Sequence, residues 1–434
     1  MKDSGKKGFA GKREGARGAA RLQLAAVGME SEFALVVDGV PEKPESVFGS
    51  PRAFLTGERM HRVGTSYHLS NGGAVYFDTG VIEVATPVIE IARGCAARAG
   101  RSLWEGILEV RSALDEWERK SGRSARLVGF STHYNISFEL PRPAQTNGRT
   151  VEKLALLLAY ILPAPVMLLA TNRRSTGVGV RPRGERVEIT CDFTPSASLM
   201  IATGTLVTGV VREVMTWPTF DLDMLRRMGI PVIAGYRPIP HTSRQGWLAR
   251  YSCFPDNPFA SGIDERRWKA RDGRRMSLRQ IAGEVVRHFW PAIRRVSDPF
   301  SFRLIGSVIR GRAPSLLELE DRPAEYEDVG RLCTWENLFP ERELSRSLYE
   351  RVLTRAVSGQ RLHMHGRVYI PVRMDGWSQV VFRRADTGTL HTFPIDYLIG
   401  RLHAWEHGSP ARGRSGSRGR ARRRTAAPTR RVCP

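Results

Sequence analysis

Two glutamates, Glu30 and Glu32, stand two positions apart in an apolar segment near the start of the chain, GMESEF at residues 28–33. Alternate residues of a strand face the same side, so both carboxylates would lie together. Oxygen ligands of this kind suit Mg²⁺ or Mn²⁺, and such an ion would relieve the repulsion between the two charges. A Glu-x-Glu pair alone is more typical of a solvated strand face, but the apolar flanks favour a buried strand.

A second group of polar residues lies in YFDTGVIE, residues 76–83. Tyr76 and Asp78 alternate onto one face of a strand, and Glu83 would lie across the following turn. A carboxylate in this apolar setting can act as a base, a nucleophile or a metal ligand. The alternative, which the motif supports equally well, is an Asp that only begins a Thr-Gly turn.

The third group is STHYNIS, residues 131–137, where Ser131, His133, Asn135 and Ser137 share one face. Histidine and asparagine on a sheet can donate hydrogen bonds to phosphate oxygens, and histidine can also bind a metal. A single histidine is more often structural. Four polar residues on one strand face are more typical of a functional surface.

The fourth group is RPRGERVE, residues 181–188, with Arg181, Arg183 and Arg186 near the start of a strand. Guanidinium groups in this arrangement suit a phosphoryl group in transfer. The alternative is a basic surface loop, which the arginine-rich composition favours. The chain has neither a P-loop signature nor a GxSxG nucleophile elbow, so those two enzyme classes lack support.

The elements that must position these residues alternate between strands and helices, with antiparallel strands concentrated early, so we predict the α+β class. Strands are predicted at 22–38, 126–139 and 186–194, and paired strands around a Thr-Gly turn at 73–86. Helices are predicted at 90–120, 151–171, 197–216 and 276–294, the last beginning at the N-cap Ser277. Residues 39–70 are predicted to be a loop. Beyond about residue 310 a smaller α/β unit is predicted, with a helix at 343–357, strands at 366–372 and 378–383, and a short helix after Pro394.

The charge of the chain is concentrated at its ends. The net charge is +23, and residues 411–434 contain nine arginines and no acidic residue. Low apolar content predicts disorder for both tails, and the arginine-rich tail could bind nucleic acid or another polyanion, although a solubilising tail is the simpler interpretation. We therefore expect four parts: 1–21, a basic tail; 22–310, a catalytic domain; 311–408, a small domain; and 409–434, an Arg-rich tail.

The remaining composition points to a cytoplasmic protein with reduced thiols. No run of eighteen apolar residues predicts a membrane span. The five cysteines have no CxxC spacing, which argues against a zinc site and against a disulfide framework. We expect Cys95, Cys191, Cys253 and Cys333 to be buried and inert.

Taken in order, these segments resemble the Pup ligase and depupylase family, which belongs to the glutamine-synthetase-like carboxylate–amine ligases. Family members open with a Gly-Ile/Met-Glu-x-Glu strand, here at 28–32. They continue with an Asn-Gly-Ala-x-x-Tyr-x-Asp strand that runs to a Glu and then Ala/Ser-Thr, here at 71–86, and with a His-x-Asn strand, here at 133–135. A further similarity, at 272–281, precedes a long helix.

The resemblance implies a glutamine-synthetase-like antiparallel β-sheet cradle packed with helices, with ATP and Mg²⁺ bound in it. By this resemblance, Asp78 would be the catalytic aspartate, and Asn135 and Ser137 would face the bound nucleotide. The residues that would line the magnesium–ATP cradle are Glu30, Glu32, Tyr76, Glu83 and His133, and those in phosphate-binding positions are Arg181, Arg183 and Arg186.

The implied activity is an ATP-dependent carboxylate–amine ligase that forms an isopeptide or peptide bond through an acyl phosphate. Its substrates would be a protein or peptide with a free carboxylate, such as a small ubiquitin-like modifier, and an amine acceptor. A depupylase-like amidase is the alternative within the family, but the interval at 33–75 leaves little room for the insert that depupylases carry. Val81 and Ile82 replace the family's His-Pro, and Tyr134 replaces the Glu of its His-Glu-Asn segment, which bears mainly on the macromolecular substrate. A nucleic-acid-binding protein that acts through its tails is the alternative from another class.

Overall fold

The computed structural model describes residues 25–57, 60–62, 65–141, 144–145, 147–241, 245–335 and 346–407. The tails predicted at 1–21 and 409–434 lie outside these residues, as does Cys433.

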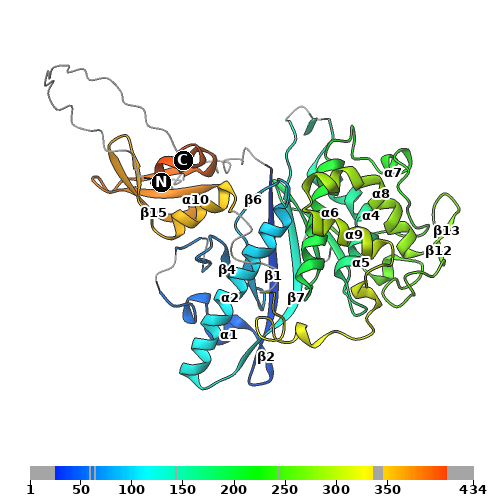
Figure 1. The fold of residues 1–434 in the computed structure, drawn as a ribbon, viewed down its shortest axis with the longest axis horizontal. Helices are drawn as coiled ribbons and strands as arrows, with labels where there is room; N and C mark the ends of the chain where they lie inside the picture. Colours follow the sequence, from blue (N-terminus) through cyan, green and yellow to red (C-terminus); the bar gives the residue numbers. More distant parts are fainter. Residues whose placement is uncertain are drawn as a thin grey trace, which may run out of the picture.

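A large antiparallel sheet with β1 near its middle organises the described part of the chain (Figure 1). Its strand order is β10-β11-β8-β9-β7-β1-β5-β4-β3, and β2 and β6 also pair with β1. The strands are β1 (Ala26–Val37), β2 (Val40–Glu42), β3 (Tyr67–His68), β4 (Ala74–Asp78), β5 (Val81–Ala85), β6 (Ile89–Glu90), β7 (Ala125–Ser137), β8 (Val178–Pro182), β9 (Arg186–Asp192), β10 (Ile239–Pro240) and β11 (Trp247–Ala249). Strands and helices in this mixture confirm the predicted α+β class.

Helices cover one face of this sheet, because alternate strand residues on that face are apolar. Met29 and Tyr134 are fully buried there and lie against α6, where Gly204 permits the approach: a Cβ at Gly204 would lie 2.4 Å from the Met29 side chain. The helices of this part are α1 (Pro44–Phe48), α2 (Cys95–Ser121), α4 (Val151–Ile161), α5 (Pro163–Ala170), α6 (Ala197–Val214), α7 (Asp223–Arg227), α8 (Leu278–Val296) and α9 (Pro299–Ile309). The opposite face is left to the polar residues.

Most predicted elements are confirmed, with two differences. The helix predicted at 151–171 is a pair, α4 and α5, bent by 63°. Pro163 explains the break, since its ring cannot donate a backbone hydrogen bond and is tolerated only at the start of a helix. The loop predicted at 39–70 contains the short elements β2, α1, β3 and the 3-10 turn η1 (Pro51–Ala53). Ser277 caps α8 as predicted, in a capping box with Gln280.

Helix α6 is long and apolar enough to cross a membrane by length and composition, with a mean hydropathy of 1.3. However, 83% of it is buried inside the protein. It packs against α2, α8 and α9, and we interpret it as a core helix. The four described cysteines are buried and free, as predicted.

Residues 346–407 form a second unit, called here the C-terminal unit, which Figure 1 shows in yellow to red on the opposite side of the sheet from α8 and α9. Its elements are α10 (Leu348–Val357), β14 (Leu362–Met364), β15 (Arg367–Asp375), β16 (Gln379–Arg384), β17 (Leu390–Pro394), α11 (Ile395–Ile399) and α12 (Leu402–His407). It has its own apolar core, which includes Tyr349 and Phe382, whereas Leu317 and Trp335 pack in the main core. The domain division near residue 310 stays a prediction.

A buried ion pair joins the C-terminal unit to α2. The fully buried Glu350 accepts hydrogen bonds from Arg101 Nη2 at 2.5 Å and from Ser102 Oγ at 2.7 Å. Because an unpaired buried charge is costly, this contact favours one position of the unit against the main sheet.

Candidate active site

The predicted polar residues meet on the sheet face that the helices leave uncovered. Strand β1 is central: its register places Glu30 opposite His133 of β7, and Glu32 opposite Glu83 of β5. Met29, Ser31 and the other alternate residues of β1 face the helices, so the two carboxylates share the open face. The structure therefore places Glu30 and Glu32 on the same face of the sheet, as the sequence predicts.

Strand β4 completes the group. Tyr76 lies opposite Glu83, and its hydroxyl donates a hydrogen bond to Glu83 Oε1 at 2.6 Å. Asp78 ends β4, and the following Thr79 and Gly80 both have positive φ, as a tight hairpin turn requires. Asp78 thus begins a turn and also directs its carboxylate toward Glu32 and Glu83. The turn role and a place in the carboxylate group, which the sequence offered as alternatives, are therefore both compatible with its position.

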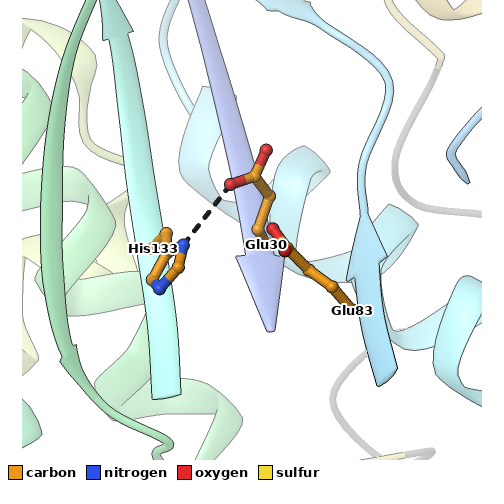
Figure 2. Close-up of side chains that lie close together, drawn as sticks. All are labelled: Glu30, Glu83 and His133. Carbon is orange, nitrogen blue, oxygen red and sulfur yellow. Dashed lines mark ion pairs between the residues drawn. The ribbon is translucent and has the colours of Figure 1, made fainter. Parts of the chain in front are cut away.

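Among the described residues, two groups of side chains have an arrangement that could hold a metal ion. Glu30, Glu83 and His133 form one, and Glu32, Asp78 and Glu83 form the other; within each group, one ligand atom per residue lies within 4.8 Å of the rest. Figure 2 shows Glu30, Glu83 and His133 extending toward one another from three neighbouring strands. We call Glu30, Glu32, Asp78 and Glu83 the carboxylate cluster. Its oxygen-rich composition fits Mg²⁺, and Glu83 is shared by both groups.

The charges of the cluster are unbalanced without a cation. Burial raises the pKa of Glu30, but the hydrogen bond and charge of His133, 3.5 Å away, together with Arg186, outweigh it and lower the pKa to about 2. Burial and then the negative charge of Glu30 raise the pKa of Glu83 to about 10. Burial and the same two carboxylates hold the pKa of Tyr76 well above its usual value. A bound cation would remove this conflict.

The three predicted phosphate-binding arginines have different surroundings. Arg181 is buried and forms an ion pair with the buried Glu188, and Arg183 Nε also donates to Glu188 Oε2, at 3.0 Å. Arg186 Nε donates to the neutral Asn135 Oδ1 at 2.7 Å. Of the three, Arg186 is therefore the one that forms no direct ion pair with a carboxylate among the described residues, although its charge acts on Glu30.

A cavity of about 580 Å³ opens beside this end of the cluster. Of the predicted site residues, its lining includes Glu30, Asn135, Ser137, Arg183 and Arg186. Glu32, Asp78 and Glu83 lie beyond the lining, further along β1 and the β4–β5 hairpin, and Arg181 lies outside it too. Ser137 Oγ accepts a hydrogen bond from the Ala26 amide at 2.9 Å, so this hydroxyl also supports the end of β1.

The sequence interpretation missed Glu188, Arg62 and Trp377 in this region. It also did not identify Ser131 as a partner of Glu32. Ser131 Oγ donates to Glu32 Oε2 at 2.6 Å and lies 3.0 Å from His133 Nε2. Glu188 Oε1 lies 4.0 Å from His133 Nδ1. Strand alternation could have found Glu188, because it is two residues from Arg186. Arg62 and Trp377 come from a loop and a turn, which carry no periodic signal.

No protein-family model matches the chain, and no curated protein matches it in sequence. Several solved chains, among them the following two, are similar to it in the course of the backbone. One is the complex of the prokaryotic ubiquitin-like protein Pup with its ligase PafA, at 11% identity and a TM-score of 0.48, covering 88% of this chain and 93% of that one. The other is the Pup ligase PafA with ADP, at 12% identity and a TM-score of 0.43, covering 78% and 90%.

Both are Pup ligases. This is the family that the motifs at 28–32, 71–86 and 133–135 resemble. The likeness to the solved structures is one of fold alone, and the activity of this chain is argued below from its own side chains.

Mg²⁺ binding is expected to release a proton from this site. Glu83, with its pKa raised to about 10, holds a proton at neutral pH and must lose it to bind a cation. Apparent Mg²⁺ affinity should therefore rise with pH, by up to about tenfold per unit below that pKa. Calorimetry in HEPES and in Tris, which differ in ionisation enthalpy, measures the proton count. Equal binding heats in the two buffers would contradict the expectation, and Glu83→Gln should remove the difference.

Proposed function

We propose that the protein is an ATP- and Mg²⁺-dependent carboxylate–amine ligase. The observation that carries the proposal is the carboxylate cluster beside a cavity whose lining includes Glu30, Asn135 and Arg186. The order along the open face is the cavity, then Glu30 and His133, then Glu32 and Glu83, and finally Asp78. A nucleotide in the cavity would therefore direct its terminal phosphate toward the cluster.

Glu30, Glu83 and His133 would hold one Mg²⁺, and Glu32 and Glu83 would contribute to a second, beside Asp78. Bound Mg²⁺ would neutralise the charge of the phosphate oxygens. Tyr76 and Ser131 orient Glu83 and Glu32 by the hydrogen bonds described above, and the apolar helix-covered layer behind β1 keeps these side chains in place. Little covalent chemistry falls to the protein, so positioning and charge stabilisation would provide most of the rate.

In the proposed first step, a substrate carboxylate oxygen bonds to the γ-phosphorus while the bond from that phosphorus to the ADP oxygen breaks. In the second step, the amine nitrogen bonds to the acyl carbon and phosphate leaves. Asp78, at the end of the face furthest from the cavity, would accept the proton that the amine loses. The partner classes are a protein or peptide with a free carboxylate, of the small ubiquitin-like kind, and an amine acceptor. Four buried free thiols fit a cytoplasmic location.

Isothermal calorimetry of ATP binding tests the proposal. ATP should bind in the presence of Mg²⁺ and lose most of its affinity in excess EDTA, because the carboxylates repel phosphate without the cation. Equal affinity under both conditions would contradict a metal-dependent nucleotide site. Titration with ssRNA is the comparison for a nucleic-acid-binding function, for which the described residues offer no separate support.

A further inference from the structure

Arg62 lies between the carboxylate cluster and the C-terminal unit, on a segment that leads into β3. Its guanidinium carbon lies 4.1 Å from the ring centroid of Trp377 and 5.7 Å from that of Tyr76. Both Arg62 and Trp377 line the cavity. Trp377 belongs to the turn between β15 and β16, so the C-terminal unit reaches the cavity through this contact.

The charge of Arg62 has no ion-pair partner among the described residues. Its side chain is half-buried, and Nε is buried without a hydrogen-bond partner. Burial lowers the pKa of Arg62, and the neighbouring Tyr76 and the carboxylate of Glu30 partly offset this effect. A buried N–H without an acceptor costs free energy, which a bound anion would recover.

The arginines that line the cavity differ in their hydrogen-bond partners. Arg183 donates to Glu188, and Arg186 donates to the neutral Asn135. Arg62 and Arg186 are thus the two cavity guanidiniums that no described carboxylate pairs with. Arg62 also lies close to the cluster, since its guanidinium carbon is 5.7 Å from the ring centroid of Tyr76, whose hydroxyl donates to Glu83. When a cation neutralises the carboxylates of the cluster, the charge of Arg62 is left for an anion held by the same cation.

Trp377 fixes the position of this guanidinium. Its ring is in contact with Arg62 on one side and meets the His68 ring edge to face, with centroids 5.7 Å apart. The His68 ring is held in turn, because Nδ1 donates to the Gly73 carbonyl at 2.9 Å. Stacking on an aromatic face leaves the guanidinium N–H groups free to donate in the plane.

We propose that Arg62 donates hydrogen bonds to the terminal phosphate of ATP and that Trp377 is the residue that positions it. This inference about Arg62 and Trp377 rests on the proposed function. During transfer, the γ-phosphorus bond to the ADP oxygen breaks as the bond to the substrate carboxylate oxygen forms, and Arg62 would stabilise the charge on the equatorial oxygens. The C-terminal unit would then complete the nucleotide site rather than only cap the sheet.

Calorimetry of Mg-ATP and Mg-ADP binding to the full chain tests the inference. Arg62→Met should weaken Mg-ATP binding by at least about tenfold, because a charge-assisted contact is lost, and should change Mg-ADP binding less than about threefold. Trp377→Leu should reduce the preference for ATP in the same direction, and Trp377→Phe should restore much of it. Arg52→Met, an exposed arginine on the preceding turn, is the matched control and should leave both affinities unchanged.

The outcomes separate the two claims. Absence of Mg-ATP binding to the unmodified protein would overturn the proposed function and this inference with it. Normal Mg-ATP binding by Arg62→Met, or an equal loss of ATP and ADP affinity, would overturn the inference alone. Arg62→Lys keeps the charge without the planar donor fork, and it provides the comparison if the methionine variant does not fold.

Discussion

Asp78→Asn should lose turnover by about a hundredfold or more, the effect expected when a general base is removed, while Mg-ATP binding and the fold persist. Asn keeps the size of the side chain and tolerates the turn that begins there. Asp78 lies beyond the cavity lining, so its loss should affect the acceptor step more than nucleotide binding. Hydroxamate formation from hydroxylamine and a pool of peptides, with ATP present, measures the turnover.

Asp38→Asn is the matched control for this substitution. Asp38 is an exposed aspartate in the turn that follows β1, with a φ of 50°, and it lies at the opposite end of β1 from the cavity. It should leave turnover unchanged. Normal turnover by Asp78→Asn with intact ATP binding would reduce Asp78 to a turn residue and remove the proposed base.

Glu30→Gln should instead weaken Mg²⁺-dependent ATP binding, by roughly tenfold to a hundredfold. Glu30 is the one member of the carboxylate cluster that also lines the cavity, so it would connect the cation to the phosphate. Gln keeps the size but not the charge, and it binds Mg²⁺ more weakly. Calorimetry with and without EDTA measures the change.

Glu42→Gln on the edge strand β2 is the control, because Glu42 is exposed and lies outside both metal-binding groups. The result that would contradict the metal-site interpretation is unchanged Mg-ATP affinity in Glu30→Gln, with the same sensitivity to EDTA as the unmodified protein. A loss of affinity in both variants would point to a change in the sheet instead.

The strand alternation in the sequence predicted which side chains share a face. Glu30 with Glu32, Tyr76 with Asp78, and His133 with Asn135 are each two residues apart, and this spacing determines their common side whatever the partner strand. The helix breaks and caps were local too: Ser277 caps α8 as its position indicated. The bend at Pro163 was missed, because the apolar pattern continues through it, and so were the short elements in the predicted loop at 39–70.

The cross-strand register and the loops required the folded chain. Glu32 meets Glu83, and Glu30 meets His133, only through pairings between strands that are far apart in sequence, and a shift of one residue would turn either side chain to the other face. The neutralisation of Arg181 by Glu188 likewise depends on the pairing of β8 with β9.

Arg62 and Trp377 illustrate the same limit most clearly. The sequence places Arg62 in a loop and Trp377 in a turn more than three hundred residues later, and neither position has a periodic neighbour to indicate its partner. Local spacing therefore determines the chemistry that each strand can present. Pairing within the main sheet determines which arginines a carboxylate neutralises, and packing of the C-terminal unit brings Trp377 against Arg62.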